Sequence, residues 1–417
     1  MSTIERTAAG TAGRGLVVPL TLTIICGCVI SALSFGLRST FGMFNEPLSS
    51  TLGWGREIFA ISIAIQNLGW GIGQPIAGAL SDKFGPARVL VGGGLIYALG
   101  MVLMSYAGSP LGVHMTAGIM VGLGMSGCSF VTVLGALGRM VSAEQRSWVM
   151  GLGSASGSLG QFLVVPLGQA FISAYGWQTA LILLGSLAAT MPVLAASFTG
   201  AGSVAAAQAA TERPLSFGAA LRQAFGNGSY RLLVIGFGAC GFQLAFITVD
   251  LPPYLADAGI SPTIAAWAIA LIGLFNIAGS YAAGVLGARF AKKKLLSVLY
   301  VVRASSIALF VLLPLTTTTI FAFAVIMGLF WLAAVPLTSG IVASLFGTRY
   351  LSTLFGIAFL SHQIGSFLGV LCGGWLYAAT GSYVPTWWVC AILSLISALI
   401  NLPIDEQQPA PAPAPAR

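Results

Sequence analysis

Runs of about twenty apolar residues recur along the whole chain, and short polar or charged stretches separate them. An apolar run of that length forms an α-helix long enough to span the hydrocarbon core of a bilayer. The pattern predicts twelve transmembrane helices, at residues 17–43, 57–79, 89–107, 112–138, 147–174, 178–198, 231–255, 262–286, 295–315, 319–345, 351–378 and 384–403. The runs lack the period-two alternation of barrel strands, so we expect an all-α membrane protein.

The amino-acid composition points to the same class of protein. Hydrophobic residues make up 57% of the 417 residues and charged residues only 7%, and the mean hydropathy is +0.94. A soluble domain carries about 25% charged residues, so this chain cannot cover a water-facing surface. The 54 glycines are typical of membrane helices that pack closely at faces of small residues. The first apolar run is too long for a signal peptide and lacks a cleavage pattern, so we expect no cleaved leader.

Basic residues are distributed asymmetrically over the connections between the predicted helices. Counting from an N-terminus on the inside, the opposite side of the membrane carries Arg56 alone. The inner side carries Arg6, Arg14, Lys83, Arg88, Arg139, Arg146, Arg213, Arg222, Arg231, Arg289, Lys292, Lys293, Lys294, Arg349 and Arg417. Positively charged loops stay in the cytoplasm, so we expect a multi-pass protein of the cytoplasmic (inner) membrane with both termini cytoplasmic. The net charge of +8 is thus a topology signal, and we expect no nucleic-acid partner.

The longest polar interruption divides the chain into two halves of six predicted helices each. Within it, residues 213–225 have the pattern of a short amphipathic helix lying on the inner surface. The expected organisation is a cytoplasmic N-terminus at 1–16, an N-terminal six-helix half at 17–198, a cytoplasmic linker at 199–230, a C-terminal six-helix half at 231–403 and a disordered Pro-Ala tail at 404–417.

The two halves repeat each other in sequence. The stretch GALSDKFGPAR, which begins at Gly78, corresponds to GVLGARFAKKK, which begins at Gly284. A longer match aligns the 26 residues that begin at Gly151 with the 26 that begin at Gly356. The identical pairs in it include Ser156/Ser361, Gly160/Gly365, Phe162/Phe367, Leu163/Leu368, Gly168/Gly373, Ala174/Ala379 and Gly176/Gly381. We therefore expect two six-helix bundles in parallel repeat.

The loop after the second predicted helix carries the pattern G-x-x-x-D-x-x-G-x-x-R, formed by Gly78, Asp82, Gly85 and Arg88. At this position in a twelve-helix chain it resembles the signature loop of the major facilitator superfamily, and the resemblance covers residues 15 to 403. It implies alternating access by two rocking halves around a cavity near the midplane. Asp82 then acts in an inner gate or serves as a surface anchor. Ala288 stands at the equivalent place in the second half, so the first half is expected to carry the gate.

Ionisable residues inside predicted membrane helices are candidates for function. Arg303 lies nine residues beyond Lys294, which at 1.5 Å per residue places it about 13 Å inward. It either contacts substrate or serves as an internal hydrogen-bond partner. His362 lies at a similar depth, and it either binds substrate or relays protons, or else packs between helices. Gln363 is turned about 100° away from His362 and is not expected to act with it.

Arg38 and Asp250 lie in the outer thirds of the first and seventh predicted helices, at matching depths. A buried pair between them would offset part of each desolvation cost. It would form either an outer gate that breaks as the halves rock or a permanent structural salt bridge. In the first alternative, Asp250 would also couple transport to protons.

The surroundings of Arg38, SFGLRSTFGMF, look like the monocarboxylate carrier branch and its bacterial oxalate and lactate relatives. In that branch the cation in the first helix assists the binding of organic anions. Asn276 matches the branch pattern F-N-x-x-x-R, but Ser280 stands where that pattern has arginine. We expect Asn276 and Tyr254 to join the binding site, and Arg303 is a candidate replacement for the missing arginine.

These observations predict a secondary active transporter that moves a small organic anion, most simply a monocarboxylate, by proton symport. The alternative is proton-driven efflux of a drug or toxic metabolite, for which Trp70, Phe242, Tyr254 and Trp331 are candidate lining residues. The G-x-G-x-x-G of residues 122–127 lies inside a predicted helix with no strand before it, so an enzyme is not expected. A receptor on the same fold would add a signalling domain.

The sequence indicates neither a cofactor nor a metal site. The six cysteines are scattered over separate apolar runs, as small buried hydrophobic residues are. The expected partners are a small-molecule substrate, protons and the lipid bilayer, and we expect the protein to act as a monomer.

Overall fold

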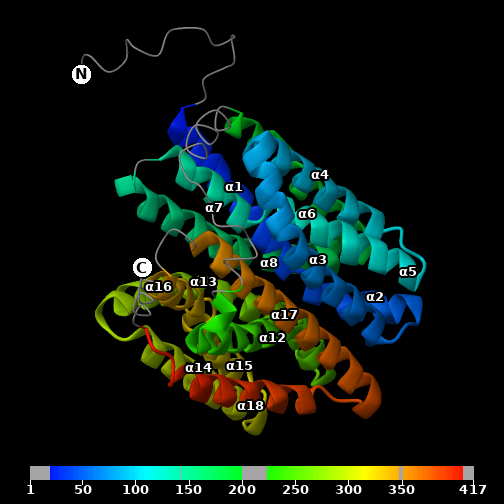
Figure 1. Ribbon diagram of the computed structural model, residues 1–417. Helices are drawn as coiled ribbons and strands as arrows, with labels where there is room; N and C mark the ends of the chain where they lie inside the picture. The colour runs from blue at the N-terminus through cyan, green and yellow to red at the C-terminus, as the bar shows by residue number, and fades with distance from the viewer. Residues whose placement is uncertain (1–18, 142, 200–221, 223, 347–350, 407–417) are drawn as a thin grey trace, which may run out of the picture.

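A computed structural model describes residues 19–141, 143–199, 222, 224–346 and 351–406. These residues form helices joined by short turns, and none of them lies in a β-strand. Figure 1 shows two helical bundles packed against each other, one coloured blue to green and the other green to red. Since α1 begins and α18 ends at the same end of the bundles, we call that end the terminal side and the opposite end the far side.

The first bundle holds the first six membrane spans. It contains α1 (Leu20–Ser39), η1 (Phe41–Phe44), α2 (Asn45–Leu52), α3 (Arg56–Phe84), α4 (Pro86–Met104), α5 (Pro110–Val113), the π-helical η2 (His114–Met120), α6 (Val121–Cys128), α7 (Phe130–Met140), α8 (Ala143–Ala188), α9 (Thr190–Ala195) and η3 (Ala196–Phe198). The fourth span is thus assembled from four short pieces. Helix α2 extends the first span at the far side, where the apolar pattern predicted no helix.

The second bundle holds the remaining six spans. It contains α12 (Gly228–Asp257), α13 (Pro262–Arg289), α14 (Lys292–Leu312), α15 (Thr317–Leu329), α16 (Ala334–Phe346), α17 (Leu351–Thr380) and α18 (Val384–Asn401). Helices α15 and α16 together form the tenth span, which is broken at residues 330–333. The sequence explains the break, because Pro336 has no N–H to donate to the carbonyl four residues earlier, and its ring crowds that carbonyl.

The twelve-helix fold predicted from the apolar runs is confirmed. Within the described residues, ten helical segments are long and apolar enough to cross a membrane. One of them, at residues 151–198, contains two spans, because Gly176 breaks α8 with φ 77° and ψ 166°. Helix α3, with 29 residues, is not among the ten and supplies the remaining span. The ten segments, with one of them divided into two spans, and α3 together make twelve spans.

The two bundles share one pattern of close helix crossings. A Cβ atom on Gly160 of α8 would collide with the backbone carbonyl of Ala32 in α1. A Cβ atom on Gly365 of α17 would collide in the same way with the carbonyl of Gly238 in α12. Gly176 and Gly381, paired by the same repeat, both have positive φ, at 77° and 70°. The sequence repeat is therefore also a repeat of packing.

Two large seams join the bundles, one between α3 and α17 and the other between α8 and α13, and η1 also packs against α12. At each seam a glutamine of one bundle lies against a glycine of the other. The Cβ of Gln363 lies 2.6 Å from where a Cβ of Gly71 would be, and the Cβ of Gln161 lies 2.9 Å from the same point on Gly273. Both seams therefore depend on glycine at the contact.

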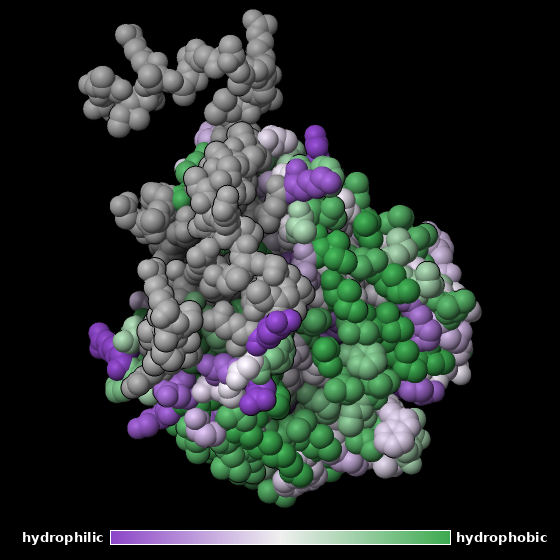
Figure 2. Space-filling model, in the orientation of Figure 1, coloured by the Kyte–Doolittle hydropathy of each residue, from purple (hydrophilic) through white to green (hydrophobic). Residues whose placement is uncertain are grey.

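The surface matches a membrane environment. Figure 2 shows apolar side chains covering most of the helix surface, while hydrophilic residues gather toward the ends of the helices. Large apolar side chains such as Val193 and Leu399 are 74% and 66% exposed, which water would disfavour and lipid does not. The segment 1–16, most of the predicted amphipathic helix at 213–225 and the tail beyond residue 406 lie outside the described residues.

Candidate functional site

Arg38 lies in the last turn of α1 and is half-buried between the two bundles. Its Nη2 donates a hydrogen bond of 2.8 Å to Oδ1 of Asn67 in α3. Its guanidinium carbon lies 5.2 Å from the ring centroid of Trp70, one turn farther along the same helix. Its Nε is buried and has no acceptor in the described part of the chain. A cation with an unused buried donor is well suited to receive an anion.

A row of aromatic rings connects Arg38 to the second bundle. Trp70 lies edge-on to Phe359 of α17, with 5.3 Å between the ring centroids. Phe359 is parallel to the ring of His362 at 6.0 Å, and His362 lies 4.9 Å from Phe237 of α12. His362 is 9% exposed, and its Nδ1 has no hydrogen-bond partner among the described residues. The row of rings therefore links Arg38 of the first bundle with His362 of the second, a proximity that the sequence did not predict.

Sequence reasoning overlooked one polar residue at this interface, Asn67, and set another, Gln363, aside. Asn67, the acceptor for Arg38, is a polar residue inside the apolar run AISIAIQNLGW, and that exception to the pattern was the available signal. Gln363 is fully buried, and neither amide atom finds a partner within the described chain. It lies on the same face of α17 as Phe359, four residues earlier, and this face packs on α3.

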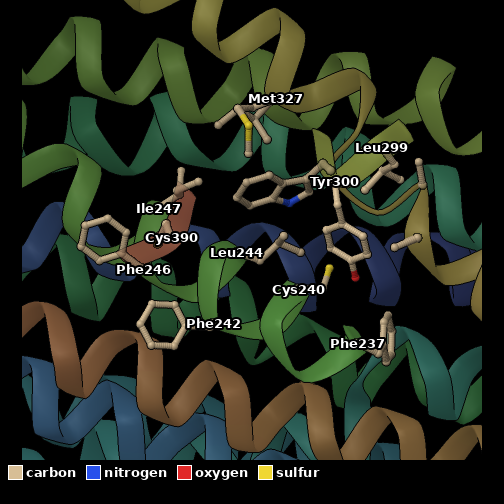
Figure 3. Close-up of a cluster of buried hydrophobic side chains, with 14 of the residues drawn as sticks. Phe237, Cys240, Phe242, Leu244, Phe246, Ile247, Leu299, Tyr300, Met327 and Cys390 are labelled. Atoms are coloured by element: carbon tan, nitrogen blue, oxygen red, sulfur yellow. The ribbon is translucent and has the colours of Figure 1, made fainter. Parts of the chain in front are cut away.

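Arg303 is fully buried inside the second bundle and is bound to protein acceptors. Its Nε donates to the carbonyl of Phe330 at 3.0 Å, and its Nη2 donates to the carbonyls of Phe330 and Trp331. Its Nη1 donates to Sγ of Cys240 at 3.2 Å. Figure 3 shows an apolar cluster of the second bundle in which Cys240 and Tyr300 point toward each other. These contacts favour the second alternative stated for Arg303, an internal hydrogen-bond partner.

Asn276 and Tyr254 also have partners inside the protein. The Nδ2 of Asn276 donates to Oγ of Ser158 at 2.8 Å, and its Oδ1 accepts from the backbone N–H of Leu332 at 2.9 Å and from Oγ of Ser280 at 3.0 Å. Tyr254 packs in an aromatic cluster, with its ring centroid 5.5 Å from that of Trp387. Neither side chain forms a hydrogen bond or ring contact with Arg38 in the described part of the chain. Their predicted role in binding therefore stays a prediction.

Asp250 is fully buried in α12, and neither carboxylate oxygen has a donor within the described residues. A Cβ on Gly373 of α17 would lie 2.5 Å from its Oδ2, so glycine leaves the space that the carboxyl occupies. The expected pairing of Asp250 with Arg38 is not found, since Arg38 bonds to Asn67 instead. The two residues lie at matching depths, but depth does not fix the direction in which a helical side chain points.

An ion pair between the bundles lies at the far side, in a different place from the predicted one. Both terminal nitrogens of Arg56, at the start of α3, donate to Asp257, at the end of α12, over 2.8 and 2.7 Å. The guanidinium carbon of Arg56 lies 4.8 Å from the ring centroid of Tyr377 in α17. Forked geometry of this kind is the strong form of an arginine–carboxylate contact. The sequence marked Arg56 only as the lone basic residue of its side.

The signature loop lies at the terminal side, between α3 and α4. Gly85 has φ 85° at the turn, a conformation that favours glycine, and Pro86 begins α4. Gly78 faces open space, and Arg88 is exposed. The side chain of Asp82 lies outside the described residues, so the inner gate remains a prediction. Ala291, which corresponds to Gly85 in the repeat, has φ −59°.

The equivalent loop of the second bundle binds the side-chain carboxylate of Glu406, which follows α18. The N-cap of α14 is Ala291, which has no side-chain acceptor. Oε1 of Glu406 accepts from the backbone N–H of Lys293 at 2.6 Å, and Oε2 lies 3.9 Å from Nζ of Lys292. Glu406 thus takes the place of a local cap at this helix start.

A metal centre is not indicated in the part of the chain that the structure describes. Among these residues no group of three or more His, Cys, Asp and Glu side chains could hold a metal ion. The six cysteines are free, and four of them are buried.

The chain matches a family model over nearly its whole length. Residues 27–254 and 233–417 match the model described as Major Facilitator Superfamily. Monocarboxylate transporter 13 of Rattus norvegicus is 29% identical over 389 residues, which cover 89% of this chain and 86% of that protein. The uncharacterized MFS-type transporter YcxA of Bacillus subtilis (strain 168) is 25% identical over 383 residues, which cover 89% of this chain and 92% of that protein.

One solved structure with the same fold is the xylose transporter XylE from E. coli in a partially occluded inward open conformation. It superposes with a TM-score of 0.67 over 91% of this chain and 96% of the other chain, at 14% sequence identity. At that identity the similarity concerns the fold alone.

Proposed function

Since the chain belongs to the major facilitator superfamily, whose members found here are membrane transporters and not enzymes, we propose that it carries a small organic anion of the monocarboxylate class. Transport proceeds by alternating access of the 17–198 and 231–403 halves and is coupled to protons. The asymmetry of basic residues supports a location in the cytoplasmic membrane, with the terminal side and both termini in the cytoplasm. It acts as a monomer.

The observation that carries this proposal is the unused donor capacity of Arg38. The guanidinium lies between the halves, uses one nitrogen to reach Asn67 and keeps its Nε buried without an acceptor. A carboxylate can accept from two guanidinium nitrogens at once, which an uncharged ligand cannot match. His362, with its Nδ1 unpartnered on the opposite half, is positioned to contact the same substrate.

Asp250 is the proposed proton site. Its carboxyl is buried in a membrane helix without a hydrogen-bond donor, where an ionisable group is expensive and therefore a candidate for function. Proton binding removes the charge from this environment, so the occupancy of Asp250 can be linked to the conformation of α12 and α17.

The far-side ion pair of Arg56 and Asp257 replaces the predicted Arg38–Asp250 gate. It ties α3 of one half to α12 of the other, so we assign the described conformation to the state in which the far side is closed. Opening toward the far side requires this pair to break. On the terminal side, Asp82 and Arg88, together with Gly78 in α3 and the turn at Gly85, remain the proposed inner gate.

A second candidate function is efflux of a drug or toxic metabolite. Ser280 stands where the carrier branch has arginine, and Arg303 already donates to backbone carbonyls. Within the described interface between the halves this leaves Arg38 as the cation with an unused buried donor. An uncharged or cationic substrate would fit a site with so little positive charge.

Uptake into sealed proteoliposomes separates the two functions. Purified protein is tested with labelled monocarboxylates and dicarboxylates, with and without an inward proton gradient. Accumulation of a monocarboxylate that collapses when a protonophore dissipates the gradient supports the proposal. Transport of no acid, in vesicles where reconstitution and orientation are verified, contradicts it and favours efflux of an uncharged or cationic compound.

A further inference from the structure

The break in the tenth span exposes backbone groups in the middle of the second bundle. Residues 330–333 are not helical, and in the membrane interior their N–H and C=O groups need partners from the protein. Arg303 of α14 supplies donors for the carbonyls of Phe330 and Trp331. Asn276 of α13 supplies the acceptor for the N–H of Leu332. The break is therefore fixed from two neighbouring helices.

Arg303 is held at this place by ion–dipole geometry and not by an anion. No carboxylate pairs with it in the described chain. Its Nε and Nη2 donate to the carbonyls that follow the C-terminus of α15, where the helix dipole is negative, and its Nη1 donates to Cys240 and Gln243 of α12. Helix α13 also lies against this end of α15, because a Cβ on Gly279 would collide with the carbonyl of Leu329. The positions of α13, α14 and the break are thus mutually dependent.

Asn276 connects the break to the other half of the molecule. The same amide that accepts from Leu332 donates through Nδ2 to Ser158 of α8. One turn along α8, Nε2 of Gln161 donates to the carbonyl of Ile269 in α13 at 2.9 Å. These bonds lie along the α8–α13 seam, which must separate when the halves rock apart on that side.

We infer that Arg303 is a positioning residue that holds the break of the tenth span, and that Asn276 transmits the position of this break to Ser158 across the α8–α13 seam. The network sets the balance between conformations, and Arg303 does not contact the substrate. This inference rests on the proposed transport function but not on the identity of the substrate.

Two matched variants test the transmission step. Ser158→Ala and Ser280→Ala each remove one hydroxyl that bonds to Asn276, but only Ser158 belongs to the other half. Spin labels on Cys at positions 152 and 285, exposed on α8 and α13, report the distance across the seam, in a chain with Cys28 and Cys372 changed to Ser. We expect Ser158→Ala to shift the ratio of short to long distances about fivefold, as loss of one hydrogen bond does. Ser280→Ala leaves the ratio within twofold of the unaltered serine.

Arg303→Met and Arg303→Lys test the positioning step. Met removes every donor, whereas Lys keeps the charge but loses the fork, so we expect the distance ratio to shift with Met and to recover in part with Lys. In proteoliposomes, kcat falls at least fivefold in Arg303→Met while KM stays within twofold. If Arg303→Met does not fold, Arg303→Lys and Ser158→Ala carry the test.

A rise in KM with an unchanged distance ratio would show that Arg303 contacts the substrate, and the inference would be wrong. Equal effects of Ser158→Ala and Ser280→Ala on the ratio would also overturn it. If the unaltered chain transports no acid, the proposed function fails instead, and the spin-label distances still decide on the network.

Discussion

Two arginines between membrane helices show how differently the same side chain is used. Arg303 donates from all three nitrogens to the protein around it, whereas Arg38 spends one on Asn67 and leaves Nε unpaired. An unpaired buried donor lowers the stability of the empty state and strengthens the response to any ligand that satisfies it. This contrast is the reason why we propose anion binding at Arg38 and not at Arg303.

Arg38 substitutions test the anion site directly. We expect Arg38→Gln to raise KM for a transported monocarboxylate by 10-fold or more, because a hydrogen bond to a charged group is worth about 1.5–3 kcal/mol. Arg38→Lys keeps the charge but loses the forked guanidinium, so we expect its KM to lie between those of the unaltered chain and Arg38→Gln. Arg289→Gln, at an exposed position, serves as the control. Equal KM values for the Lys and Gln variants would refute paired recognition of the carboxylate.

Asp250→Asn tests proton coupling. We expect the variant to exchange labelled for unlabelled acid at a rate close to that of the unaltered chain, but not to accumulate acid against its gradient. The reason is that asparagine keeps the shape of the side chain and cannot take up a proton. Glu46→Gln, at an exposed far-side position, is the control for removing a carboxylate. Accumulation by Asp250→Asn with unchanged dependence on the proton gradient would remove Asp250 from the coupling mechanism.

The failure of the Arg38–Asp250 pairing has a residue-scale cause. Counting residues along a helix gives depth in the membrane, because the rise per residue is constant. Direction depends on the rotation of each helix about its axis, which packing sets. Arg38 faces Asn67 and Trp70, while Asp250 faces Gly373. For the same reason the partnership of Arg56 with Asp257 could not be read from the sequence.

At the scale of elements, apolar run length predicts the existence of the twelve spans well and their internal breaks poorly. Runs of apolar residues cross a bilayer whether they are straight or broken, so the pattern carries no signal for the π-helical segment η2 or for the interruption after α15. Proline does mark the second break, at Pro336. The internal repeat carried more information, since it paired Gly160 with Gly365, both of which lie at close crossings.

Glycine substitutions in α17 test the crossing that the repeat predicts. A Cβ on Gly365 would meet the backbone of Gly238, whereas nothing lies within 4 Å of a Cβ on Gly356 in the same helix. We expect Gly365→Ala to lower the unfolding temperature in detergent, with a cost of about 1–3 kcal/mol for overpacking. Gly356→Ala leaves it unchanged or raises it slightly, because alanine favours helix. Equal melting temperatures for the two variants would show that the crossing can relax.

At the scale of the whole molecule, polar contacts as well as apolar packing hold the halves together. The contacts between them include a forked ion pair, amide hydrogen bonds and glycine seams. Polar contacts at an interface can exchange partners with water or with each other at modest cost. A carrier needs such an interface, because its two conformations must differ little in free energy.

The Arg56–Asp257 pair provides the test of that view. Asp257→Arg and Arg56→Asp each place like charges together at the far side, so we expect either variant to favour the far-side-open state and to slow exchange of a transported acid. The double variant restores opposite charges with the geometry reversed and recovers much of the exchange rate. Since both side chains are partly exposed, at 16% and 35%, the expected change for each single variant is severalfold and not larger.

The matched control is the ion pair of Lys292 and Glu406, which lies within one half and at the terminal side. Reversing its charges, singly and together, changes the capping of α14 but not the contact between the halves, so the exchange rate stays within twofold. Spin labels at position 52, just before Arg56, and at position 260, just after Asp257, report the distance between the two halves at the far side. If the single far-side variants leave that distance unchanged, or if the double variant recovers nothing, the pair is a surface contact and another feature closes the far side. If the exchange rate falls in both single variants and recovers in the double variant, the contact between the charges, and not the packing around Tyr377, holds the two halves together at that end.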